Sequence, residues 1–404
     1  MPAQSLLQFT GKSIYCSVAD AHIDPWIPVE RAIITHAHSD HARWGSKHYL
    51  AHKDSEPILR LRLGQDISLQ TVEYYEKFVI NGVTFSLHPA GHIIGSAQVR
   101  VEYKGEVWVA SGDYKLEDDN FATPFEPVKC NVFITESTFG LPIYKWQPQH
   151  EVMTEIDNWW LQNKSEDKAS ILMGYSLGKM QRILKNIELQ DKIIYAHGAI
   201  YTLNERLRQA GFDLPELTLV TKETDRKLFR GALVLAPPSV DSSTWIKKFA
   251  PYSLGYCSGW MALRGAKNRR AVDQGFVLSD HVDWPDLNTA VKESGAEKVY
   301  VTHGYTSIYS RWLNENGIEA GEVHTMYGNE DENEEEEAVQ DISTGTKAYE
   351  EHKGVLDSAI IASGKLQKES VSQEPPTPKG EKKYDNQQQE KSPLGDLGAN
   401  THKP

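Results

Sequence analysis

The chain of 404 residues is 39% apolar and 25% charged, a composition typical of a soluble protein with room for more than one core. No run approaches the ~18 apolar residues of a membrane-spanning helix, and the first twenty residues lack the basic start and apolar core of an export signal, so we expect neither membrane insertion nor export. Residues 330–404 contain 17 Asp and Glu and 9 Lys, so this segment carries a charge of −8 out of the net charge of −13. Residues 1–329 therefore carry a charge of only −5, which does not exclude a nucleic-acid substrate.

Three cysteines, Cys16, Cys130 and Cys257, are scattered along the chain and form no CxxC pair. Their odd number argues against a disulfide framework. We therefore expect a cytoplasmic protein in a reducing environment.

Residues 1 to about 140 alternate short β-rich runs with turns. Strands are predicted within residues 11–18, 77–85 and 99–110, and the pairs Asn81-Gly82 and Lys104-Gly105 are typical of hairpin turns. A short helix is predicted over residues 55–63, where Pro57 lies near the start and leucines follow at helical spacing.

A cluster of metal-binding side chains follows the apolar run at residues 32–34, which we interpret as a buried strand. His36, His38, Asp40 and His41 lie within six residues. Imidazole and carboxylate suit zinc or manganese, and the alternating spacing lets His36 and His38 bind one ion while Asp40 and His41 turn toward a second. A lone histidine is usually packed or solvated, but this density favours a metal site.

Two further metal-binding residues come at the ends of predicted strands. His92 follows the alternating run at residues 84–88, and Asp113 follows the apolar run at residues 107–110. The whole pattern resembles the metallo-β-lactamase superfamily. The resemblance implies one metal set of His36, His38, His92 and Asp113, and a second set of Asp40, His41, Asp113 and a later histidine, with Asp113 bridging the two ions.

From Gln149 the hydrophobic pattern changes, and segments with helical spacing alternate with β-branched runs. Helices are predicted at residues 151–164, 178–189 and 203–210, and strands at 170–174, 192–196 and 232–236. This alternation indicates a parallel sheet. The paired Trp159 and Trp160 could stack on bases, but tryptophans on an amphipathic helix are more often part of a core.

Two more histidines end apolar runs later in the chain, His281 and His303. With them the resemblance narrows to the β-CASP nucleases, whose acidic motif resembles the segment around Glu136 and whose inserted domain resembles residues 175–181, 235–239 and 255–259. The likeness covers about residues 13–327. Residues 35–45 and the compact length look most like the bacterial DNA-ligase-associated exonucleases, a group related to Artemis-type DNA repair nucleases and to mRNA 3′-end processing nucleases.

The resemblance implies an α/β fold, namely an αββα metallo-β-lactamase sandwich of residues 1–145 and 273–328, interrupted by an α/β β-CASP domain at residues 146–272. Residues 329–404 are acidic and poor in apolar side chains. Such a segment buries too little surface to offset its chain entropy, so we expect a disordered tail.

The implied chemistry is phosphodiester hydrolysis. Two ions about 3.5–4 Å apart can hold a hydroxide between them and stabilise the attacking and leaving oxygens. We predict Asp40, His281 and Glu136 as catalytic residues, with His281 protonating the leaving oxygen and Glu136 orienting it. The alternative is that His281 only supports a metal ligand. His303 completes the second set.

Several residues are candidates for binding the substrate. Lys179 begins a predicted helix whose free N–H groups favour a phosphate, and Ser176 adds a hydroxyl. A run of basic residues could contact the nucleic-acid strand, although a solvated loop is an equally good interpretation of this run. Two residues beside the first metal motif could contact the nucleotide or, equally, pack beneath their loop. These residues are Lys267, Arg269 and Arg270 in the run, and Arg43 and Trp44 beside the motif.

Three functions compete on this evidence. A metal-dependent nuclease uses every motif, a small-molecule hydrolase leaves Glu136, His281 and the insertion unexplained, and a non-catalytic scaffold would be expected to have lost ligands. We expect a DNA exonuclease that takes part in repair alongside a DNA ligase or other repair proteins, with two zinc or manganese ions. An RNA-processing β-CASP endo- or exoribonuclease is the alternative, since RNA-processing members of the family typically carry a histidine at the position of His303.

Overall fold

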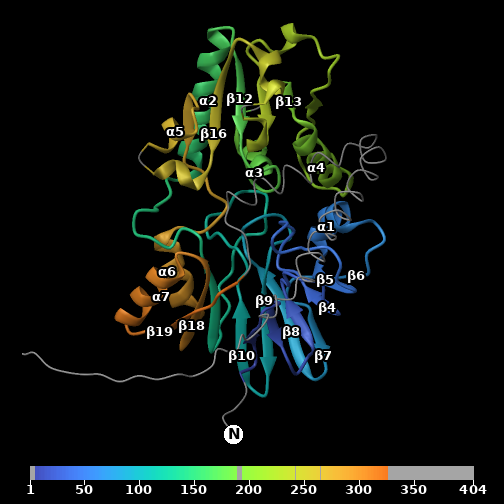
Figure 1. The fold of residues 1–404 in the computed structure, drawn as a ribbon, viewed down its shortest axis with the longest axis vertical. Coiled ribbons are helices and arrows are strands. Elements are labelled where there is room, and N and C mark those ends of the chain that lie inside the picture. The colour runs from blue at the N-terminus through green and yellow to red at the C-terminus, as the bar shows by residue number, and fades with distance from the viewer. Residues whose placement is uncertain (1–4, 189–192, 242, 264, 326–404) are drawn as a thin grey trace, which may run out of the picture. The chain divides into compact units, whose positions relative to one another are not determined.

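Three β-sheets form the framework of the part of the chain that the structure describes (Figure 1). In the computed structural model the described residues are 5–188, 193–241, 243–263 and 265–325. The acidic tail predicted at residues 329–404 lies outside them. Among the described helices, none combines the length and the apolar composition needed to cross a membrane.

The first sheet follows chain order, and its strands are antiparallel from β1 to β3 and parallel from β3 to β6. The helix predicted at residues 55–63 is confirmed, because a short 3-10 turn leads into α1 with Pro57 in its first turn. The elements are β1 (Gln8–Phe9), β2 (Ile14–Cys16), β3 (Ala21–Ile23), β4 (Arg31–Ile33), β5 (His48–His52), η1 (Lys53–Ser55), α1 (Glu56–Leu63) and β6 (Leu69–Val72).

The second sheet joins strands from both halves of the chain. Its order is β19 (Glu319–Glu322), β18 (Lys298–Gly304), β11 (Val132–Ser137), β10 (Glu106–Ala110), β9 (Ala97–Tyr103), β8 (Val83–Pro89) and β7 (Lys77–Ile80). Both predicted hairpin turns are confirmed, since Asn81, Gly82, Lys104 and Gly105 all have positive φ, as type I′ turns require. β11 and β18 pair in parallel, with Ile134 opposite Tyr300, so the segment after the third sheet returns to complete this one.

The two sheets pack face to face and are covered by helices on their outer sides. Between the sheets lies one apolar core, to which Ile23, Phe85 and Trp108 belong. Ile58 and Leu59 of α1 pack on the outer face of the first sheet. The outer face of the second sheet is covered by α6 (Trp284–Ser294) and α7 (Thr306–Glu315). Figure 1 shows these two helices beside β18 and β19. This is the αββα sandwich that the sequence motifs imply.

The third sheet is entirely parallel, as the sequence predicts. Its strand order is β14-β13-β15-β12-β16-β17. Trp160 is buried in its core and donates from Nε1 to the carbonyl of Gly231, and Trp159 packs against the same core, so the core interpretation of this pair is confirmed. The elements are α2 (Gln149–Ser165), β12 (Ala169–Met173), α3 (Lys179–Asn186), β13 (Ile194–Ala196), α4 (Gly198–Gln209), β14 (Thr218–Leu219), η2 (Arg226–Phe229), β15 (Leu233–Ala236), η3 (Pro238–Val240), η4 (Thr244–Phe249), β16 (Tyr252–Cys257), η5 (Gly259–Ala262), α5 (Ala266–Arg269) and β17 (Gln274–Phe276).

One helix boundary differs from the sequence-based expectation. α4 begins at Gly198 instead of residue 203, because the side chain of His197 accepts the N–H of Ala199 and caps the helix. β17, which follows the predicted domain limit at residue 272, pairs with β16 in the third sheet. The described residues all belong to one compact unit, and the domain limits at 145, 272 and 328 stay a prediction.

Candidate metal centre

The ends of strands from two sheets bring the candidate ligands together. His36 follows β4, His92 follows β8 and Asp113 follows β10, while His303 lies in β18. Glycine is required at residue 112, because its φ is +59° and a Cβ atom there would lie 2.7 Å from the Thr35 side chain. The loop that carries Asp113 can therefore approach the His36 loop closely.

Asp113 is common to three groups of side chains whose ligand atoms all lie within 4.8 Å of one another. The first group matches the first metal set implied by the sequence, and the second contains most of the other set. The groups are His36, His38, His92 and Asp113; His41, Asp113 and His303; and Asp113, Glu136 and His281. Asp40, expected as a ligand of the second ion, adjoins the second group with its Oδ2 atom 3.5 Å from Nε2 of His41.

Four imidazoles share one orientation, in which Nδ1 is held by a fixed partner and Nε2 faces Asp113. The partners of Nδ1 are Thr35 Oγ1 for His36 (3.1 Å), Asp24 Oδ2 for His41 (2.8 Å), the Asp280 carbonyl for His92 (2.8 Å) and Thr302 Oγ1 for His303 (3.2 Å). The Nε2 atoms lie 3.5, 3.4, 3.9 and 2.9 Å from the nearer Asp113 oxygen in the same order. An Nδ1 atom that carries the proton leaves the Nε2 lone pair for a metal.

His38 has the opposite orientation. Its Nε2 atom lies 3.2 Å from the carbonyl of Leu177, which belongs to the loop after β12 of the third sheet. Its Nδ1 atom lies 3.1 Å from Nε2 of His92, so His38 presents Nδ1 to the first group. The third sheet thus contributes a hydrogen-bond acceptor that fixes one of the candidate ligands.

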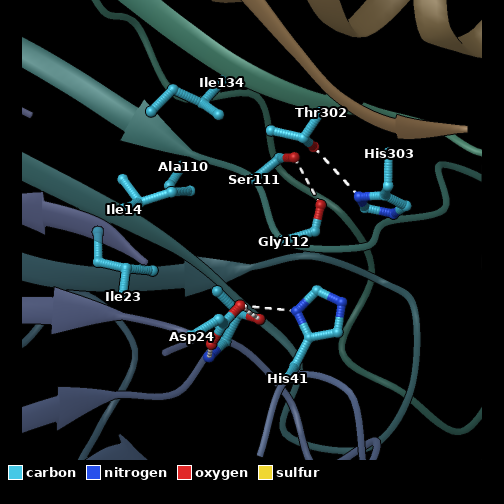
Figure 2. A pocket seen from close by; sticks show the side chains of 11 residues that line it. Ile14, Ile23, Asp24, His41, Ala110, Ser111, Gly112, Ile134, Thr302 and His303 are labelled. Atoms are coloured by element: carbon cyan, nitrogen blue, oxygen red, sulfur yellow. Dashed lines mark hydrogen bonds and ion pairs between the residues drawn. The ribbon is translucent and has the colours of Figure 1, made fainter. Parts of the chain in front are cut away.

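Asp24 is a candidate functional residue that the sequence motifs did not single out. Its carboxylate accepts from His41 Nδ1, from the hydroxyl of Thr35 at 2.5 Å and from the Thr35 N–H at 2.8 Å. Figure 2 shows the bond between Asp24 and His41, with His303 on another wall of the small cavity that these residues line. The available signal was an Asp directly after β3, at a strand end like the other candidate ligands.

The buried charges favour a cation at this centre. Burial keeps the pKa of His36 and of His92 well below the ordinary value, so both are neutral. Burial opposes protonation of His41 as well, yet Asp113, Asp40 and Asp24 together raise its pKa well above the ordinary value. A proton on His41 thus compensates surplus carboxylate charge, and a divalent ion would take over that role.

The donor set fits divalent metals. The Nε2 atom of His36 is buried and has no hydrogen-bond partner among the described residues, although it faces Asp113. A buried polar atom without a partner is costly unless a ligand completes its environment. Imidazole nitrogens and carboxylate oxygens suit zinc and also accept manganese.

Glu136 and His281, which belong to the third ligand group, form a buried pair. Nδ1 of His281 lies 2.9 and 3.2 Å from the two carboxylate oxygens of Glu136. Glu136 also accepts the N–H of Tyr114 at 2.8 Å and the hydroxyl of Thr138 at 2.6 Å, so its position is fixed. The ring of His281 lies 4.7 Å from that of His92, measured between centroids.

Two residues predicted to contact the substrate are buried. Lys179 is fully buried, with Nζ 3.5 Å from Asp280 and 4.5 Å from the centre of the Tyr175 ring. Ser176 is also buried. The helix start predicted at Gly178 is confirmed, and the contacts of Lys179 and Ser176 with a phosphate stay a prediction.

The remaining predicted contacts differ in exposure and in their partners. Trp44 is 74% exposed and so does not pack beneath its loop, while Arg43 donates to the carbonyl of Asp40. Lys267 is exposed on α5, and the Arg270 guanidinium stacks over Tyr256. The side chain of Arg269 is outside the described part of the chain.

Comparison with known proteins places these observations in a family. No family model matches the chain. A probable DNA ligase from Opitutus terrae is 31% identical over 303 residues, which are 74% of this chain and 29% of that protein. Cleavage and polyadenylation specificity factor 73 from Drosophila melanogaster is 22% identical over 239 residues, or 45% of this chain and 35% of that protein. Endoribonuclease YSH1 from Saccharomyces cerevisiae is 28% identical over 129 residues, or 24% of this chain and 17% of that protein.

The chain thus spans between 17% and 35% of the length of these relatives. Among solved structures, a protein of unknown function from Enterococcus faecalis V583 shares the fold, with a TM-score of 0.52 and 11% identity over 74% of this chain and 80% of that one. The sandwich, the inserted parallel sheet, the ligand groups around Asp113 and these relatives together point to a β-CASP metallo-β-lactamase nuclease family.

Proposed function

We propose that this chain is a metal-dependent phosphodiesterase that degrades DNA from an end, in strand repair linked to a DNA ligase. The observation that carries the proposal is the convergence of His36, His38, His92, His41 and His303 on one carboxylate, Asp113. A nuclease needs such a centre because the phosphodiester transition state carries dense negative charge.

Two divalent ions, zinc by preference and manganese as the alternative, would supply a strong nucleophile at neutral pH and neutralise charge on the phosphate. His36, His38 and His92 would hold one ion, and His41 and His303 the other, with Asp113 shared between them. Asp40 adjoins the second group and would complete it.

His281 is proposed to protonate the leaving oxygen of the phosphodiester. Its Nδ1 atom donates to Glu136, whose buried carboxylate orients the ring and stabilises the protonated imidazole. The proton on Nε2 is then the one that leaves. A general acid of this kind typically contributes about 10²–10⁴-fold to the rate.

DNA is the proposed substrate because the ligase-named relative matches 74% of this chain, whereas the relative named endoribonuclease matches 24%. The same likeness supports a DNA ligase or another repair protein as a partner. The free thiols of Cys16, Cys130 and Cys257 support a reducing cytoplasm as the location.

RNA processing is the second candidate. It is favoured by the relatives named cleavage and polyadenylation specificity factor 73 and endoribonuclease YSH1, and by the histidine at position 303, 2.9 Å from Asp113. His303 also has a purely chemical explanation as a metal ligand, which does not depend on the sugar of the substrate.

Matched DNA and RNA oligonucleotides of one sequence, each labelled at one end, test both candidates. We expect chelator-sensitive cleavage in the presence of Mn²⁺ or Zn²⁺, a higher kcat/KM for DNA, and products that shorten from one end. The Asp113→Ala protein controls for contaminating nucleases, and His150→Ala, an exposed position on α2, is the matched neutral control. Faster turnover of RNA would overturn the DNA assignment, and chelator-resistant cleavage would overturn the metal mechanism.

A further inference from the structure

A buried arginine joins the inserted sheet to the metal centre. Arg182 lies on α3, the first helix after β12, and its side chain is completely buried. It donates from one terminal nitrogen to the carbonyl of Ser279 at 2.5 Å, and the same nitrogen lies 3.3 Å from the carboxylate of Asp280. Arg182 therefore holds the segment that immediately precedes His281.

That segment acts on two candidate functional residues through its main chain. The carbonyl of Asp280 accepts from Nδ1 of His92 at 2.8 Å, which orients the Nε2 atom of His92 toward Asp113. The next residue is His281, whose own N–H donates to the hydroxyl of Ser279 at 3.0 Å. A shift of this segment would move His92 and His281 together.

Arg182 also reaches the loop that follows Asp113. Its Nε atom lies 3.4 Å from the carboxylate of Asp119, which in turn accepts the N–H groups of Phe121 and Ala122. One planar guanidinium thus contacts the segment before His281 and the loop after Asp113, which are far apart in sequence. Lysine, a point charge, cannot hold two acceptors in this fixed geometry.

We infer that Arg182 is a positioning residue for the metal centre, which fixes His92 through the Asp280 carbonyl and His281 through the segment at residues 279–281. Its effect on His92 concerns metal binding, whereas its effect on His281 rests on the proposed nuclease function. A buried guanidinium is costly unless it is paired, and Arg182 finds its partners in the segment before His281 and in the loop after Asp113.

The test compares Arg182→Met and Arg182→Lys with Arg208→Met, the same change at a partly exposed arginine on α4. The readouts are the affinity for each of two Zn²⁺ ions, the absorption spectrum of the Co²⁺-substituted protein, and kcat and KM on labelled DNA. Partners of metal ligands typically contribute about 10–100-fold to metal affinity or activity. We expect Arg182→Met to lower the affinity of one ion and kcat by such factors, to alter the Co²⁺ spectrum, and to change KM by less than about twofold.

Arg182→Lys decides the matter if Arg182→Met does not fold, and we expect it to lower kcat by about tenfold because the fork is lost while the charge is kept. Wild-type affinity, spectrum and kcat in a folded variant would overturn the inference, and so would a rise in KM alone, since that indicates direct substrate contact. If the wild-type protein binds two ions but cleaves no nucleic acid, the proposed function fails, while the affinity and the Co²⁺ spectrum still test the role of Arg182.

Discussion

Replacing Asp24 by asparagine should weaken one metal site more than the other. Asp24 Oδ2 accepts from His41 Nδ1 at 2.8 Å and from the Thr35 hydroxyl at 2.5 Å. The Thr35 oxygen in turn lies 3.1 Å from Nδ1 of His36. The carboxylate therefore holds His41 directly and His36 through one intermediate hydroxyl.

The magnitude follows from the bond that is lost. An asparagine in this place can turn its amide NH₂ toward His41, which favours the tautomer with the proton on Nε2, the atom that should bind the metal. A hydrogen bond to a charged group contributes about 1.5–3 kcal/mol. A loss of about 2 kcal/mol corresponds to about 30-fold in the affinity of the ion held by His41 and His303. The ion held by His36 should lose less, because Thr35 keeps one contact with that ring.

The assay is a titration of metal-free protein with Zn²⁺ in competition with a coloured chelator, which resolves the two affinities. Thr35→Val is the complementary variant, and we expect it to weaken only the ion at His36. Asp20→Asn, at a carboxylate that is 56% exposed in the turn between β2 and β3, is the matched control and should leave both affinities unchanged. Two ions bound to Asp24→Asn with wild-type affinities would refute the reasoning. An equal loss at both sites would show that Asp24 supports the fold of the loops and not the orientation of His41.

Three further expectations follow. Asp113→Ala should lose both ions and all cleavage, because Asp113 belongs to every ligand group, and elemental analysis that finds two ions would contradict this. His281→Ala should keep both ions and DNA binding but cleave about 10²–10⁴-fold more slowly, with part of the loss recovered on a substrate with a better leaving group, whereas loss of metal would make His281 a ligand. Burial, aided by Lys248, lowers the pKa of His197 from 6.5 to about 4. As the pH falls below 6.5, His197 therefore takes up a proton in the unfolded chain before it does so in the folded protein. By pH 4 this difference should lower the free energy of unfolding by about 3 kcal/mol. Urea unfolding of His197→Gln between pH 7 and 4 checks this, and a slope equal to that of the wild-type protein would refute it.

The local patterns of the sequence were sufficient for several of the elements and for proposing most of the candidate ligands. Hairpin turns at Asn81-Gly82 and Lys104-Gly105, the parallel third sheet and the core position of Trp160 all follow from short-range spacing and residue type. Candidate ligands at strand ends were recognisable for the same reason, because parallel strands place their carboxyl ends at one edge of a sheet.

The environment of those ligands was decided only by the tertiary structure. The bond from His41 to Asp24 spans 17 residues, and the bond from His92 to the Asp280 carbonyl spans 188. No local pattern specifies such contacts, because they form when loops from different sheets pack against one another. The same packing buries Lys179 against Asp280, so a lysine that reads as a phosphate ligand in the sequence is part of the protein interior. Residue type and spacing determined which groups can bind metal, and burial decided which atoms face the centre and which charges compensate one another.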